Sequence, residues 1–191
     1  MGPQTATRPI GLMRQAAAPM LAAALLGACS GDGGPSLPAG PLAPGSVTSY
    51  TAANAILTQG HSETELGPGQ FRVKAKGSSV TPPARLEKIA MARAAEIGVE
   101  QNQKFFKPGP FVHSAMCAAA KDLPNKSGKL GAVRSPVVEM DVVYAKDAAG
   151  DPAFLPAADT FARISAEIAS EAVTAEAKAA AAGEIASKCG K

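Results

Sequence analysis

Leu-Gly-Pro-Gly-Gln-Phe-Arg-Val-Lys-Ala-Lys, residues 66–76, is the stretch that most clearly indicates the fold class of this chain. Its Gly67–Gly69 portion combines two glycines with a proline, which are residues that favour tight turns. In residues 70–76 apolar and polar side chains alternate, which is the two-residue period of a strand with one face on a core. Residues 55–66 end in a second alternating run, so the two runs predict a β-hairpin.

A helical pattern follows the hairpin. Thr81 offers a hydroxyl that can cap free N–H groups, and Pro82 suits the first position of a helix. Apolar side chains then recur every three or four residues as far as about Gln103. We expect this helix, Pro82 to Gln103, to pack on the apolar face of the hairpin.

The second half of the chain predicts one more strand and one more helix. The turn-rich residues 107–110 should break any strand there, and residues 111–119 show no clear pattern. Val137–Ala145 is rich in β-branched and aromatic residues and predicts a strand. The alanine-rich stretch Ala157–Ser187 predicts a long helix, with Gly183 as its weak point. The expected fold is α+β: a small antiparallel sheet packed by one central helix and one long C-terminal helix.

Residues 1–28 have the order of a bacterial secretory signal. A basic start is followed by the apolar run Ala16–Leu26, and the small residues Gly27 and Ala28 come next. The run is shorter than the roughly 20 residues that a membrane-spanning helix needs. We therefore expect a signal that is cleaved rather than retained.

The signal ends in Leu26, Gly27, Ala28 and Cys29, which resemble the lipobox of bacterial lipoproteins. In that motif the cysteine thiol receives diacylglycerol before the chain is cut ahead of it. Two or three acyl chains would hold a protein on a membrane far more firmly than one chain does. Ser30, in place of aspartate, favours sorting to the outer membrane, with the domain facing the periplasm. The alternative is an ordinary signal peptide that happens to precede a cysteine.

Residues 29–49 predict a stiff tether between this anchor and the folded domain. Prolines recur at every third position from Pro35 to Pro44, which matches the three residues per turn of polyproline II. Fully extended, the tether would reach roughly 60 Å. A ligand for a proline-binding module is the alternative interpretation. The predicted organisation is a signal peptide (1–28), a lipidated cysteine and tether (29–49) and a single envelope domain (50–191).

Charge argues against nucleic acid as a partner. Two of the 19 basic residues, Arg8 and Arg14, lie in the signal, so 17 remain against 16 acidic residues. A nearly neutral chain lacks the basic surface that neutralises phosphates. The hydrophobic content of 46% is enough for a core, and with only 4% aromatics that core should be aliphatic and alanine-rich.

Three segments between about Ala53 and Phe106 resemble a family of small, functionally uncharacterised envelope lipoproteins of alphaproteobacteria. They are Gly60–Glu63, Leu66–Val73 and Arg93–Glu96, which are similar to the family's Gly-Tyr-x-Glu, Phe-Arg-Val and Arg-Ala-Ala-Glu elements. His61 stands where the family usually has tyrosine, so no role of that hydroxyl carries over. The resemblance implies an α/β envelope domain and supplies no activity or ligand.

The cysteines offer a disulfide or a nucleophile. With Cys29 acylated, Cys117 and Cys189 remain in an oxidising compartment and predict a disulfide. It would close a loop of about 70 residues and stabilise the fold by roughly 3 to 5 kcal/mol. The alternative is a reactive Cys117 activated by His113, four residues away and on one face if the segment is helical.

Other polar side chains suggest structural roles first. Glu63 and Glu65 share one face of a strand, which could serve acid–base chemistry but more often is a solvated face. Arg93 lies on the apolar stripe of its helix with Glu96 at i+3, which predicts a half-buried ion pair. No Cys-x-x-Cys or His-Glu-x-x-His spacing occurs, so no metal and no cofactor is expected.

These observations predict a non-enzymatic envelope lipoprotein that binds another envelope component, a protein or a glycan. An enzyme that uses Cys117 or the Glu63 and Glu65 pair is a second hypothesis. A structural or stress-sensing lipoprotein is a third.

Overall fold

The computed structural model describes residues 45–54, 58–118 and 133–190. The predicted lipobox, residues 26–29, and most of the predicted tether lie outside these ranges. The described elements are β1 (Gly60–Gly67), β2 (Gln70–Lys76), α1 (Pro83–Glu100), β3 (Phe105–Pro108), β4 (Val112–Ala118), β5 (Val133–Ala145), β6 (Leu155–Pro156), α2 (Ala157–Ser170) and α3 (Ala175–Lys188). They form an antiparallel sheet with three helices, so the predicted α+β class is confirmed.

The predicted hairpin is present as β1 and β2, which pair antiparallel. β1 begins at Gly60, later than predicted, and residues 55–57 lie outside the described ranges. Gly69 in the turn has a φ of 69°, a left-handed conformation that favours glycine. The apolar side chains of β2 are buried as the alternation predicted: Phe71, Val73 and Ala75.

β5 is the central strand of the sheet. β2 pairs along one of its edges, and β3 and β4 pair one after the other along the opposite edge. Residues 109–111, between β3 and β4, stand opposite only Met140 and Asp141, which is the geometry of a β-bulge. Gly109 donates its N–H to the Asp141 carbonyl at 2.7 Å, and a Cβ on Gly109 would lie 3.0 Å from that oxygen. The prediction that the turn-rich residues 107–110 interrupt the strand agrees with the structure, since β3 ends at Pro108 and β4 begins at Val112, and the bulge lets pairing with β5 resume.

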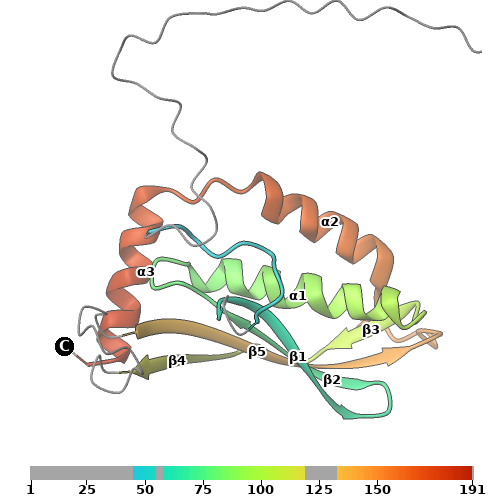
Figure 1. The fold of residues 1–191 in the computed structure, drawn as a ribbon. Coiled ribbons are helices and arrows are strands. Elements are labelled where there is room, and N and C mark those ends of the chain that lie inside the picture. The colour runs from blue at the N-terminus through green and yellow to red at the C-terminus, as the bar shows by residue number, and fades with distance from the viewer. Residues whose placement is uncertain (1–44, 55–57, 119–132, 191) are drawn as a thin grey trace, which may run out of the picture. The chain divides into compact units, whose positions relative to one another are not determined.

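α1 lies between the sheet and α2 (Figure 1). Nine of its 18 residues are buried, and five of these nine are alanine or glycine. Because the helix is covered on two sides, burial extends beyond the single apolar stripe that the sequence predicted. A Cβ on Gly98 would lie 2.9 Å from the Cβ of Ala157 and 3.3 Å from the Tyr144 ring. Small residues therefore allow α1 to approach its neighbours closely.

The ends of α1 differ from the prediction. Pro82 is the N-cap, and Thr81 makes hydrogen bonds elsewhere: its Oγ1 accepts the Thr48 N–H at 3.0 Å and lies 2.8 Å from Ser78 Oγ. The helix ends at Glu100, and two residues later Asn102 has a φ of 54°. Thr81 thus connects the segment before the sheet to the start of α1 instead of capping the helix.

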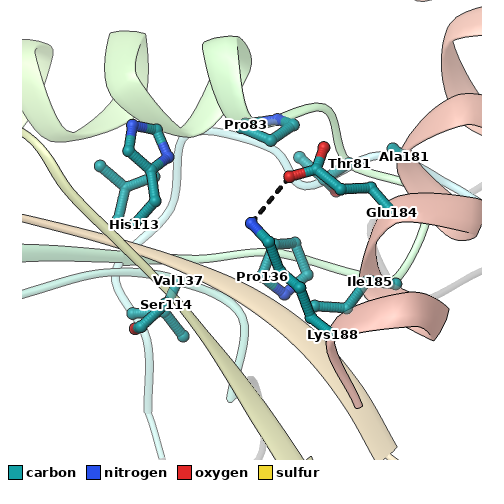
Figure 2. Close-up of a pocket in the computed structure, with 11 residues that line it drawn as sticks. Thr81, Pro83, His113, Ser114, Pro136, Val137, Ala181, Glu184, Ile185 and Lys188 are labelled. Atoms are coloured by element: carbon teal, nitrogen blue, oxygen red, sulfur yellow. Dashed lines mark hydrogen bonds and ion pairs between the residues drawn. The ribbon is translucent and has the colours of Figure 1, made fainter. Parts of the chain in front are cut away.

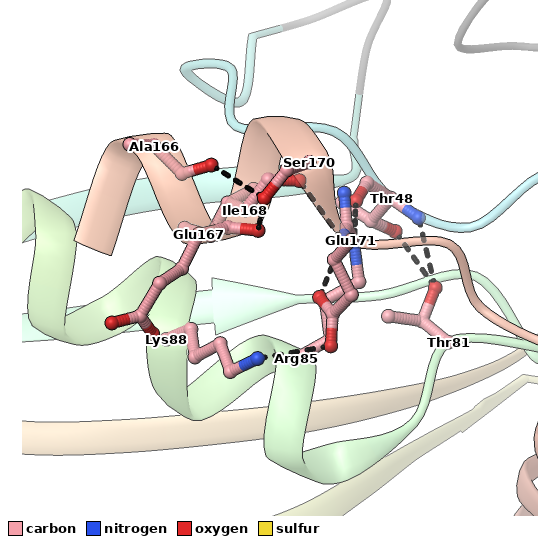
Figure 3. Close-up of polar contacts among 9 residues, drawn as sticks. All are labelled: Thr48, Thr81, Arg85, Lys88, Ala166, Glu167, Ile168, Ser170 and Glu171. Carbon is pink, nitrogen blue, oxygen red and sulfur yellow. Dashed lines mark hydrogen bonds and ion pairs between the residues drawn. The ribbon is translucent and has the colours of Figure 1, made fainter. Parts of the chain in front are cut away.

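The C-terminal helical stretch is divided into α2 and α3, where one long helix was expected. The break lies at residues 171–174, whereas Gly183 lies inside α3. Thr174 starts the second helix, because its side chain accepts the Ala177 N–H at 3.2 Å. Glu171, just after α2, pairs with Arg85 and Lys88 of α1 (Figure 3). The break therefore coincides with a side-chain contact to another helix.

Candidate functional site

Cys117 of β4 and Cys189, the C-cap residue of α3, form a disulfide with Cα atoms 5.5 Å apart. This is the pairing predicted from the sequence. It joins the C-terminal end of α3 to the edge of the sheet. It also leaves no free thiol for the nucleophile hypothesis at Cys117.

His113 does not activate Cys117. Both residues lie on β4, which is a strand, so their four-residue spacing separates the Cα atoms by about 13 Å instead of one helical turn. The Nε2 atom of His113 lies 3.1 Å from the Glu87 carboxylate of α1. The predicted i, i+4 arrangement is wrong because the segment is extended.

A polar cluster surrounds Arg93, where α1 crosses the edge strand β1. Arg93 donates to both carboxylate oxygens of Glu63, from Nε at 3.1 Å and from Nη2 at 2.8 Å. Its Nη1 donates to Glu96 at 2.6 Å and to Glu100 at 2.9 Å. The Arg93 side chain is 13% exposed, so the half-buried pair with Glu96 is confirmed. The ion pair between Arg93 and Glu63 therefore joins α1 to β1.

Hydrogen bonds within this cluster favour the charged forms of Arg93, Glu63 and Glu96. Burial lowers the pKa of Arg93, but hydrogen bonds to Glu63, Glu100 and Glu96 raise it more, and the net pKa lies above its usual value. The hydrogen bonds from Arg93 hold the pKa of Glu63 below its usual range. Glu63 lies on the same face of β1 as Glu65, and both of its carboxylate oxygens accept hydrogen bonds from Arg93. The ion pair with Arg93 favours the deprotonated form of Glu63, which argues against a role for Glu63 as a proton donor.

Tyr50 and His61 complete the cluster on the side of the N-terminal segment. The Tyr50 hydroxyl donates to Glu96 at 2.6 Å, and the Tyr50 ring stacks on His61 with centroids 4.7 Å apart. Burial raises the pKa of Tyr50, and the hydrogen bond to the Glu96 carboxylate raises it further. Burial and then Arg93 lower the pKa of His61, whose buried Nδ1 has no hydrogen-bond partner in the described structure. His61 is thus a neutral ring packed against an aromatic neighbour.

Sequence reasoning did not find Tyr50 or Arg85. Arg85 is buried near the start of α1 and donates to the Thr48 carbonyl at 2.9 Å and to Glu171 at 2.6 Å (Figure 3). An arginine on the apolar side of a predicted helix is rarely buried without a partner, so the sequence could have indicated that Arg85 is paired. Tyr50 gave no comparable signal, because its partners lie 11 residues or more away in sequence.

A small cavity lies where α3 meets α1, β4 and β5. Figure 2 shows His113 at one side of it and the α3 pair Glu184 and Lys188 at the other, with Lys188 donating to Glu184 at 2.7 Å. The cavity volume of about 10 Å³ is about that required by one water molecule. The cavity therefore does not fit an organic substrate.

The sheet face opposite α1, which we call the outer face, carries paired charges. Arg72 forms a bidentate ion pair with Asp141, donating from Nε at 2.7 Å and from Nη2 at 2.9 Å. Lys74 pairs with Glu139 at 2.9 Å. In Figure 1, α1 and α2 lie on the other side of the sheet. A hollow of about 280 Å³ is lined by Arg72, Pro110, Val112, Glu139, Met140 and Asp141. This surface offers fixed charged groups beside apolar ones, which suits polar recognition.

Comparisons of the chain with models of protein families, with curated proteins and with solved structures found no match. Within residues 45–54, 58–118 and 133–190, no group of three or more His, Cys, Asp or Glu residues is placed to hold a metal ion. None of the helices in the same ranges has the length and apolar character that a membrane span requires.

Proposed function

We propose that this chain is a lipoprotein of the bacterial cell envelope, acylated at Cys29, whose folded domain is a non-enzymatic binding or structural module. The pairing of the cysteines carries the proposal. The chain has three cysteines, and two of them are joined as Cys117–Cys189. Cys29 is the one outside the pair, and it directly follows the apolar run and its small residues. Disulfides persist in oxidising compartments, which agrees with export.

The membrane is then the first partner, through the lipid on Cys29, and the outer membrane is the proposed location. The proline-rich residues 29–49 act as a spacer that lets the domain reach away from the membrane. The outer face supplies the surface for a second partner, an envelope protein or a glycan. Ordered charges beside a hollow of about 280 Å³ support this choice of surface.

The intact mass of protein extracted from membranes tests the anchor. We expect a chain that starts at Cys29 and carries the mass of two or three acyl chains. Alkylation should modify Cys117 and Cys189 only after reduction. A Cys29→Ser variant should lose the added mass and keep the disulfide. Wild-type protein without lipid, or with Cys29 free for alkylation, would refute the anchor.

Crosslinking in intact envelopes tests the outer face. The double variant Arg72→Ala with Asp141→Ala removes one exposed ion pair and conserves net charge. Arg163→Ala with Glu167→Ala removes a similar exposed pair on α2, where the two groups are 2.8 Å apart, and is the matched control. Exposed pairs contribute little to stability, so both variants should fold. We expect the first variant to recover a specific partner at least about tenfold less well and the second to match wild type. Equal recovery by both, or no specific partner for wild type, would contradict the proposed surface.

A further inference from the structure

The edges of the sheet are protected to different degrees. Along β1, His61 donates its N–H to Thr51 at 2.9 Å and accepts the Ala53 N–H at 2.7 Å, so residues 51–53 cover part of that edge. β1 also carries Glu63 and Glu65. The edge of β3 is covered by β6. Covering segments and charged side chains are the means by which natural sheets avoid pairing with other chains.

Within residues 45–54, 58–118 and 133–190, no segment covers the free edge of β4, and β4 carries no charged Lys, Arg, Asp or Glu side chain. Among the described strands it pairs only with β5. Its sequence, Val-His-Ser-Ala-Met-Cys-Ala, contains no Lys, Arg, Asp, Glu, Pro or Gly. Val112 and Met116 are 58% and 42% exposed, although both are apolar. An exposed edge strand of this composition is a template for pairing with a further strand.

We propose that β4 is the interface for a second copy of this chain, paired antiparallel and edge to edge around Ala115. A two-fold interface must be complementary to itself. β4 meets this condition because it carries no Lys, Arg, Asp or Glu side chain. Pairing with the same strand of a second copy therefore brings no such like charges together. The proposal does not depend on the lipid anchor, and it shares one residue, Val112, with the lining of the hollow on the outer face.

The register follows from the side chains. Pairing around Ala115 places that small residue against itself and Met116 opposite Ser114 of the second copy. Diagonal neighbours in an antiparallel pair lie about 7–8 Å apart, within reach of a methionine. Met116 therefore also approaches Val112 of the second copy. The exposed apolar side chains of both copies form one row, which removes them from water.

The disulfide prepares β4 for this role. Cys117 lies near the end of the strand and is bonded to Cys189 of α3. A strand that is already held in place loses less conformational freedom when it pairs, so pairing is more favourable.

Sedimentation velocity of the full mature chain, purified in detergent, tests the interface. Met116→Lys places a charge near its own copy across the two-fold axis. Val143→Lys places the same charge at a residue of nearly equal exposure, 43% against 42%, on the central strand β5. We expect wild type to sediment as a dimer, Met116→Lys to raise the dissociation constant at least about tenfold, and Val143→Lys to leave it unchanged. A monomeric wild type, or equal weakening by both variants, would overturn the proposal.

A photocrosslinking side chain checks the same interface without adding charge. Placed at Ala115 in intact cells, it should yield a crosslinked dimer of this chain, whereas the same group at Thr64 of β1 should not. Crosslinking of position 115 to a different protein, or equal dimer yields at both positions, would overturn pairing between copies.

Discussion

α1 and α3 are both alanine-rich helices, but the molecule holds them in different ways. α1 buries nine residues, among them Leu86 and Ile89, between the sheet and α2. α3 buries Ala181 and Ile185 and packs on β5. At its C-terminal end, α3 is bonded to β4 by the disulfide.

The difference shows how a helix with little apolar surface can still be part of a fold. Burial of a large apolar side chain contributes about 1.5–3 kcal/mol, so a helix with several such residues docks by packing alone. A helix with one large buried side chain has little left after the entropy of ordering is subtracted. For α3, the disulfide to β4 therefore provides stabilisation in addition to the small contribution of packing.

Removal of the disulfide should have the largest effect. We expect Cys117→Ser with Cys189→Ser to lower the free energy of unfolding by about 4 kcal/mol, because the bond closes a separation of 72 residues. Hydrogen exchange should accelerate in α3 much more than in α1. Ser187→Ala, an exposed change on α3, is the control and should leave both rates unchanged. Unaltered protection of α3 in the double variant would show that packing alone holds it.

Truncation of a buried side chain should have the next largest effect, and it should differ between the helices. Leu86 is 0% exposed, and Leu86→Ala should cost about 3 kcal/mol. Ile185 is 3% exposed. Changing it to alanine should lower the free energy of unfolding by about 1–2 kcal/mol, because α3 can shift into the space that is left. Urea denaturation with the disulfide intact measures both values. Equal losses would mean that α3 is packed as rigidly as α1.

Elements with local signals could be predicted from the sequence. The β2 alternation, the apolar spacing of α1 and the composition of β5 each depend on neighbouring residues, and each element is present. The Arg93–Glu96 pair was predicted for the same reason, since its members are one turn apart on one helix. The disulfide could be predicted because two cysteines remain once Cys29 is assigned to lipid.

Apart from the disulfide, features that depend on distant partners could not be predicted. The break after α2 involves Glu171 and Arg85, which are 86 residues apart. Tyr50 meets Glu96 across 46 residues, and Glu63 meets Arg93 across 30. The bulge at residues 109–111 appears only once β5 is known to pair with both β3 and β4. In each case the local sequence allows several conformations, and a tertiary contact selects one.

The smallest effect concerns pH, and it tests the contact between α1 and β1, a contact of charged and polar side chains that α3 does not share. His61 lies beside Arg93 of α1 and faces Tyr50, Glu63, Glu96 and Glu100, and its folded-state pKa lies below the usual 6.5 because burial and Arg93 disfavour the charged ring. The unfolded chain therefore binds this proton more readily, so stability is complete above pH 6.5 and falls as pH decreases toward the folded-state pKa.

The slope from one group cannot exceed about 1.4 kcal/mol per pH unit. Glu63 and Glu96, whose pKa values are also lowered, lose their contribution only below their usual 4.5, which separates the two windows. Urea midpoints between pH 7.5 and pH 5 should thus decline more steeply for wild type than for His61→Gln. If His61→Gln keeps the full slope of wild type, the pH-sensitive contact lies outside the Arg93 cluster.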